Sequence, residues 1–268
     1  MLLKASFIIA VVIMFAACSQ GQTRGNKSQP KNSVDHSDDN NELLKEAYKL
    51  SFEGNYPAAV FLFKSIISGY SEADFVKQAK LGMADSYISK GGYESRLEAD
   101  LIFSEWLKDY SDQPLAEEVE YRRIQNAIEL AKYPGRDGWP ELRPERLLKE
   151  YLKNHPNSIH RFEAQADLKE IQGRLATGDL NVALFYMNNR QAWAGAEGRL
   201  KEVLERYPDF ADIDRVLFLL GKVEMERDDS EQAAQCLRQL IKKYPNSLYR
   251  TGACDQLAVM GQFDECKE

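Results

Sequence analysis

Cysteine and histidine are the residue types in this 268-residue chain whose chemistry is most distinctive. Cys18 stands alone near the N-terminus, whereas Cys236, Cys254 and Cys266 lie in the last part of the chain. No Cys-x-x-Cys pair accompanies them, and the three histidines do not complete a metal-ligand grouping, so we expect no metal and no cofactor. Phosphate-loop, His-Glu-x-x-His and Gly-x-Ser-x-Gly motifs are also missing from the sequence. We therefore expect that the protein is not an enzyme.

The N-terminal segment has the pattern of an export signal. Lys4 supplies a positive charge, and residues 7–17 are an uninterrupted run of eleven apolar residues. Eleven helical residues span about 16 Å, well short of the roughly 30 Å hydrocarbon core of a bilayer. The run predicts a signal peptide over residues 1–17 rather than a membrane-spanning helix.

The signal ends in Phe15-Ala16-Ala17-Cys18, which resembles the lipobox of bacterial lipoproteins. The resemblance implies that the bond before Cys18 is cut and that this cysteine carries a diacylglycerol and an N-terminal acyl chain such as palmitate. Acyl chains in that number anchor a protein permanently. Because no Asp follows Cys18, the resemblance also implies the outer membrane, on its periplasmic face. The alternative is an ordinary secretory signal with a cysteine in its apolar region.

The three remaining cysteines are an odd number in an oxidising compartment. These residues could form one disulfide and leave one free thiol. Cys236 and Cys254 are the pair to test first, because their helices are expected to be neighbours. The alternative is that both are small buried apolar residues without a disulfide.

Composition indicates the fold class and excludes one class of partner. Only three threonines occur, whereas Leu, Ala, Glu, Lys and Gln fill most segments, so an all-α protein is favoured over a β-sandwich or barrel. The net charge is −7, which gives no basic surface for a nucleic acid. Residues 18–41 are rich in Gly, Ser, Asn, Gln, Lys and Asp, and are expected to form a flexible tether.

A recurring segment end divides residues 42–262 into units of similar length. A ring residue followed by Pro or Ser ends each unit, at Tyr70, Tyr110, His155, Tyr207 and Tyr244. Apolar residues fall at helical spacing between these ends, and the pattern resembles the tetratricopeptide repeat. The resemblance implies a right-handed superhelical solenoid of about five helix hairpins, with a C-terminal capping helix and a tail over residues 263–268.

Residues 42–260 as a whole resemble the BamD family of outer-membrane assembly lipoproteins. The best match runs from Tyr151 to Pro208 and includes the segment ends His155-Pro156 and Tyr207-Pro208. The resemblance implies a scaffold of the β-barrel assembly machine that binds a BamA-type barrel protein, accessory lipoproteins and unfolded outer-membrane proteins. The alternative is a generic tetratricopeptide-repeat lipoprotein adaptor that coordinates cell-envelope or peptidoglycan synthesis.

The register of the first helices predicts a binding groove. Taking Ala47 and Ala84 as the small packing residues of two first helices places five apolar residues towards the concave side, namely Leu44, Tyr48, Phe52, Leu81 and Ile88. Such a groove could receive an extended peptide that ends in an aromatic residue. The alternative is that these side chains pack against a neighbouring helix.

Overall fold

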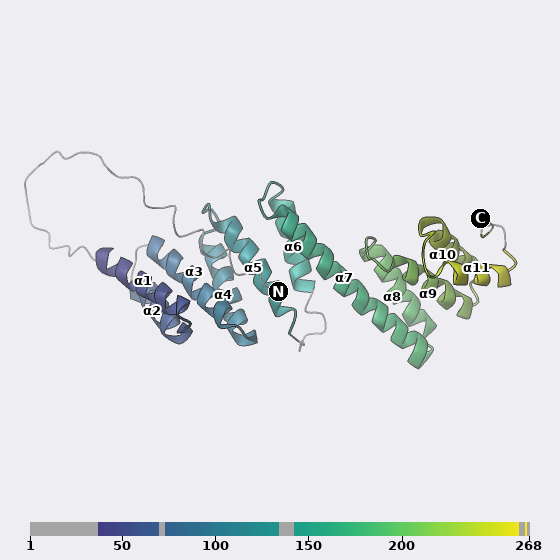
Figure 1. Ribbon diagram of the computed structural model, residues 1–268, viewed down its shortest axis with the longest axis horizontal. Helices are drawn as coiled ribbons and strands as arrows, with labels where there is room; N and C mark the ends of the chain where they lie inside the picture. The colour runs from purple at the N-terminus through teal and green to yellow at the C-terminus, as the bar shows by residue number, and fades with distance from the viewer. Residues whose placement is uncertain (1–36, 70–72, 134–141, 263–265, 267–268) are drawn as a thin grey trace, which may run out of the picture. The chain divides into compact units, whose positions relative to one another are not determined.

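The computed structural model describes residues 37–69, 73–133, 142–262 and 266, and these residues form eleven α-helices, one π-helical turn and no strand (Figure 1). The folded unit spans Asp39–Glu268. The predicted signal peptide, Cys18 and most of the predicted tether lie outside the described residues. The tether predicted over residues 18–41 is too long, because the first helix begins at Ser37. Two aspartates follow Ser37 in the sequence, and such residues favour the start of a helix.

The helices form five consecutive hairpins followed by a single helix, which confirms the all-α repeat architecture. From α2 to α11, each helix packs mainly on its neighbours in the chain, as expected for a solenoid. In order they are α1 (Ser37–Phe52), α2 (Tyr56–Gly69), α3 (Ala73–Lys90), α4 (Tyr93–Asp109), α5 (Ala116–Leu130), α6 (Leu142–Asn154), α7 (Arg161–Phe185), the π-helical turn η1 (Tyr186–Arg190), α8 (Trp193–Arg206), α9 (Ile213–Glu226), α10 (Ser230–Lys243) and α11 (Arg250–Val259).

The predicted repeat ends are confirmed wherever they are described. The backbone N–H groups of His155, Tyr207 and Tyr244 donate to the carbonyl oxygens four residues earlier, at 2.8, 3.0 and 2.8 Å. A proline follows each of these residues and cannot donate the next hydrogen bond, so the helix stops there. Tyr70 lies outside the described residues.

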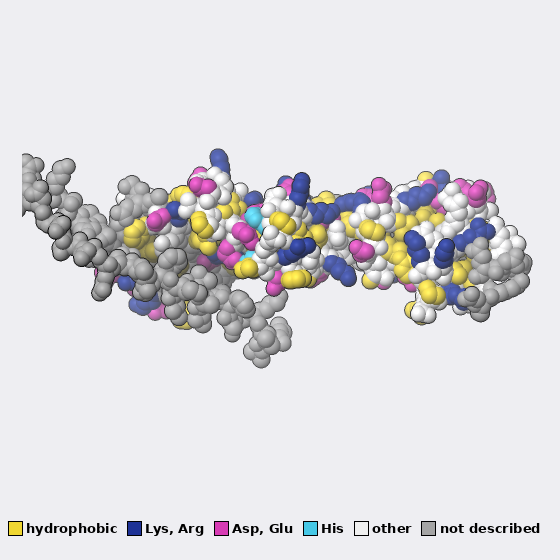
Figure 2. All heavy atoms as spheres, turned by 90° about the horizontal axis from the view of Figure 1, so that it is seen from above, with side chains coloured by type: hydrophobic (Ala, Val, Ile, Leu, Met, Phe, Trp, Pro, Cys, Tyr) yellow, Lys and Arg dark blue, Asp and Glu magenta, His cyan; other side chains and the backbone are white. Residues whose placement is uncertain are grey.

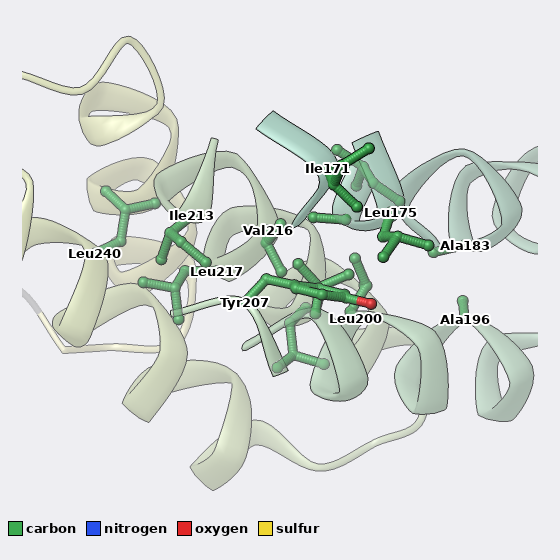
Figure 3. Close-up of a cluster of buried hydrophobic side chains, with 14 of the residues drawn as sticks. Ile171, Leu175, Ala183, Ala196, Leu200, Tyr207, Ile213, Val216, Leu217 and Leu240 are labelled. Carbon is green, nitrogen blue, oxygen red and sulfur yellow. The ribbon is translucent and has the colours of Figure 1, made fainter. Parts of the chain in front are cut away.

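The apolar side chains are buried in two separate clusters. The first joins α1 to α4 and includes Val119 of α5, whereas the second runs from Ile124 of α5 to Leu257 of α11. Figure 3 shows part of the second cluster, where Leu175 of α7, Leu200 of α8 and Val216 of α9 come together. Because α5 contributes to both clusters, it is the helix that joins the two halves of the repeat array.

The C-terminal end is closed by a disulfide that differs from the predicted one. Cys254 in α11 is bonded to Cys266, with Cα atoms 5.8 Å apart, and Cys236 is a free thiol. The candidate pair Cys236–Cys254 is therefore wrong, since Cys254 is bonded to Cys266. Gly261, just after α11, adopts φ +75°, the left-handed conformation that commonly ends a helix. Burial raises the pKa of the Cys236 thiol to about 11.

Candidate binding face of the first helices

A glycine brings α1 and α2 close to α3. A Cβ atom added at Gly82 in α3 would lie 2.5 Å from Cζ of Phe63 and 2.9 Å from Cε1 of Tyr48. These two rings meet edge to face, with centroids 5.2 Å apart. Because only glycine leaves room for both rings, Gly82 determines how closely the Tyr48 ring approaches α3.

Tyr48 is held in one orientation but is still accessible. Its hydroxyl donates to the backbone oxygen of Gln78 at 3.1 Å, and its side chain is 41% exposed. Burial of the rest of the ring raises the pKa of Tyr48, and the charge of Arg122 opposes that rise. The ring therefore forms a fixed, partly apolar surface on the α1 side of the face.

The five residues of the predicted groove do not all reach this surface. Tyr48 and Phe52 are exposed, and Phe52 is 91% exposed at the end of α1. Leu44 and Leu81 are only 7% exposed and belong to the first apolar cluster, so their place in the predicted groove is corrected. Ile88 is half-buried against the same cluster. A first helix is buried over a wider stripe than the positions of its small residues alone predict, because other helices pack on two sides of the helix.

Two polar residues complete the face, and the sequence analysis did not predict either of them. Asp85 in α3 and Arg122 in α5 form an ion pair, and the Arg122 guanidinium lies 5.2 Å from the centroid of the Phe103 ring. Tyr48 and Asp85 are 37 residues apart and hold equivalent positions in α1 and α3, and Arg122 reaches this face from α5. The same step joins Ala47 to Ala84, and applying it to Tyr48 would have found Asp85.

A second polar cluster joins α5 to the turn between α6 and α7. His155 Nε2 lies 2.9 Å from Oε2 of Glu120, and His160 Nε2 lies 2.7 Å from Oε2 of Glu118. On the side of the molecule that Figure 2 shows, histidine side chains (cyan) lie beside acidic ones (magenta). Within the described part of the chain, no group of three or more His, Cys, Asp or Glu residues is arranged to hold a metal ion. The two contacts join α5 of the third repeat to the turn that precedes α7.

A cavity of about 980 Å³ lies between α7 and the turn that joins α8 to α9. Lys169, Gly173, Thr177 and Asn181 line it from α7, and residues 205–211 close its other side. Both charges and apolar atoms border the cavity, so its lining does not select one class of ligand. None of the described helices combines the length and the apolar character needed to cross a bilayer.

Comparisons with known proteins agree with this architecture. A family model described as YfiO, outer membrane lipoprotein, matches residues 36–227, and a tetratricopeptide repeat model matches residues 215–247. The second match covers α9 and α10, the fifth hairpin.

Three similar relatives are each named outer membrane protein assembly factor BamD. The relative from Xylella fastidiosa (strain Temecula1) is 23% identical over 213 residues, which are 75% of this chain and 68% of the relative. The relative from Neisseria gonorrhoeae is 22% identical over 79% of this chain and 81% of its own length. The relative from Vibrio cholerae is 28% identical over 52% of this chain and 71% of its own length.

Among solved structures, MamA AMB-1 aligns with 81% of this chain and 97% of its own, at 13% identity and a TM-score of 0.36, too low to support a conclusion. The outer membrane lipoprotein model, in contrast, matches well over half of the sequence. This chain therefore belongs to the YfiO family of outer membrane lipoproteins.

Proposed function

We propose that this protein is a scaffold of outer-membrane protein assembly that binds extended segments of unfolded barrel proteins on the face formed by α1, α3 and α5. One observation carries the proposal: three successive first helices contribute to this face, since Arg122 of α5 pairs with Asp85 of α3 and its charge acts on Tyr48 of α1. Tyr48 is 41% exposed, and the side chains of Asp85 and Arg122 are 45% and 27% exposed. The name shared by the relatives supports the assembly role.

The chemistry of the face fits the end of such a segment. Tyr48 and the exposed Phe52 offer apolar ring surface to an aromatic side chain. Arg122 offers a guanidinium to a terminal carboxylate, and Asp85 can accept a hydrogen bond from a peptide N–H group. A chain terminus that ends in an aromatic residue would satisfy all three groups at once.

Peptide binding to the full chain tests this assignment. A peptide from the C-terminus of a barrel protein should bind wild type more tightly than a Tyr48→Ala, Phe52→Ala double mutant. Leu101→Ala is the matched control, because Leu101 is 54% exposed on α4, which is a second helix. Equal affinity for all three proteins would refute the groove.

The role of Arg122 has a separate test, since Arg122 also pairs with Asp85. Replacing the terminal carboxylate of the peptide with an amide should weaken binding to wild type. The same amide should make no further difference to Arg122→Gln, because the charge it would pair with is already removed. If the amide weakens binding equally in both proteins, Arg122 does not contact the peptide end.

We also propose that Cys18 carries the acyl anchor, that residues 18–36 link it to α1, and that the repeat array extends over residues 37–262. Labelling of cells with palmitate should mark wild type and not Cys18→Ala. Affinity capture from detergent-solubilised membranes then tests the partners. Recovery of a BamA-type barrel protein and accessory lipoproteins supports the assembly role, whereas recovery of envelope-synthesis proteins alone favours the adaptor alternative.

A further inference from the structure

The outward face of α2 differs in composition from a normal soluble helix surface. The helix contains a single charged residue in 14, Lys64. Its exposed side chains lie at spacings of four, three, one and three residues, which place them on one stripe of the helix. They are Pro57, Phe61, Lys64, Ser65 and Ser68. Phe61 is 69% exposed, in the middle of this stripe.

The two serines add little polarity to the stripe. Ser65 Oγ donates to the backbone oxygen of Phe61 at 3.0 Å, and Ser68 Oγ donates to the backbone oxygen of Ser65 at 3.2 Å. Each hydroxyl has therefore used its one donor within the helix. The surface that remains is a large apolar ring and one flexible cation.

The next second helix, α4, shows that exposed apolar residues do not by themselves make such a surface. Tyr93, Leu97 and Leu101 are 39, 38 and 54% exposed on α4. Glu94 and Glu98 are exposed beside them, so the outward face of α4 is acidic. An anionic surface would repel α4 and attract the lysine of α2.

The position of α2 in the chain indicates what covers its outward stripe. Cys18 is 19 residues before the start of α1, and 19 residues span at most about 65 Å even when fully extended. The proposed anchor therefore holds the first hairpin close to a bilayer, where even a weak contact is populated because of its high local concentration. A phenylalanine can enter the headgroup region, and a lysine stem lies along apolar surface with its ammonium at the phosphates.

We propose that the outward stripe of α2 docks on the phospholipid surface of the membrane that holds the anchor, with Phe61 inserted and Lys64 at anionic headgroups. This contact fixes which side of the first repeat faces the membrane. The inference rests on the proposed acylation of Cys18, which supplies the proximity.

Tryptophan fluorescence of the acylated full chain tests the docking. The protein is reconstituted in vesicles of phosphatidylethanolamine and phosphatidylglycerol that carry bromine on their acyl chains, which quenches nearby tryptophan. Phe61→Trp is the reporter and Leu101→Trp on α4 is the matched control, since both positions are exposed. Emission of the parent protein is subtracted to remove native tryptophans such as Trp106, which is buried.

Brominated lipid should remove most of the emission from the tryptophan at position 61 and leave that from position 101 unchanged. Adding Lys64→Glu to the reporter should reduce the quenching in anionic vesicles and have little effect in phosphatidylcholine vesicles. Equal quenching at positions 61 and 101 would overturn the docking of α2, and unchanged quenching with Lys64→Glu would overturn the role of Lys64.

Co-flotation of the protein with vesicles separates this inference from the anchor. Flotation of wild type without quenching at position 61 would refute the docking and leave the anchor standing. Failure of wild type to float would refute the anchor, and the docking with it.

Discussion

The imidazole of His160 lies flat on the ring of Tyr121, with ring centroids 4.1 Å apart and planes 11° apart. Its Nε2 atom also lies 2.7 Å from Oε2 of Glu118. Tyr121 and Glu118 belong to α5, the helix shared by the two apolar clusters, whereas His160 ends the turn before α7. The stack and the hydrogen bond therefore hold the turn that begins the fourth repeat against the helix that begins the third.

Replacing His160 should show which of these two contacts matters more. We expect His160→Ala to lower the free energy of unfolding by about 1–2 kcal/mol, since it removes an aromatic stack and a partly exposed hydrogen-bonded pair. His160→Phe keeps the stack and should lose less. Urea denaturation at neutral pH measures both. If the Phe substitution is as damaging as the Ala substitution, the contact with Glu118 rather than the stack holds the joint.

Gly82 should be intolerant of the smallest substitution. Gly82→Ala places a methyl group within 2.5 Å of the Phe63 ring, so we expect a loss of about 1–3 kcal/mol in the free energy of unfolding. Gly173→Ala is the matched control, because a Cβ atom on this other first helix meets nothing within 4 Å. The control should gain up to about 1 kcal/mol from helix propensity. Equal changes in the free energy of unfolding at both positions would show that the helices packed around Gly82 shift to accommodate the methyl group.

Tyr207→Phe should stabilise the protein. Tyr207 is 3% exposed, and its hydroxyl has no hydrogen-bond partner among the described residues. Removing a buried unsatisfied hydroxyl should raise the free energy of unfolding by about 1 kcal/mol, which urea denaturation measures. A loss of stability in the Tyr207→Phe variant would indicate that the hydroxyl is satisfied in solution.

The same tyrosine should contribute to alkaline unfolding. Burial raises the pKa of Tyr207 to about 12 from an ordinary value of 10.0. Below pH 10 the phenol is protonated in both states, so its titration has no effect on stability. Between pH 10 and 12 the unfolded chain releases the proton first, and stability falls as pH rises. Thermal unfolding across this range should show a shallower decline for Tyr207→Phe than for wild type, and parallel declines would refute the assignment.

The repeat ends could be predicted because their cause is local. Pro156, Pro208 and Pro245 stop their helices wherever the chain leads, since each lacks the N–H group that the next turn needs. The candidate binding face was predicted only in part. Helical periodicity assigns Leu44 to a side of α1, but its burial depends on how α2 and α3 close over that side.

The ion pair of Asp85 with Arg122 and the bond of Cys254 with Cys266 depend on relations between distant elements. The first joins α3 to α5 and depends on how these two helices pack side by side, which the periodicity of a single helix does not give. The second depends on the position of Cys266 after the end of α11, which no periodic pattern marks. Sequence reasoning paired Cys254 with a cysteine on the neighbouring helix because that helix was the only partner whose position could be inferred.

The disulfide should stabilise the last helix rather than the whole array. Cys254 lies in α11, and its bond to Cys266 closes a loop with a sequence separation of 12. A loop of this size corresponds to about 3 kcal/mol on the chain-entropy model. We expect Cys266→Ser to accelerate hydrogen exchange at α11 amides, including that of the buried Leu257, while α5 to α7 stay protected. Cys236→Ser is the control, because its thiol lies outside the bond and should leave exchange at α11 unchanged. Unchanged exchange in both variants would show that packing on α10 alone holds the helix.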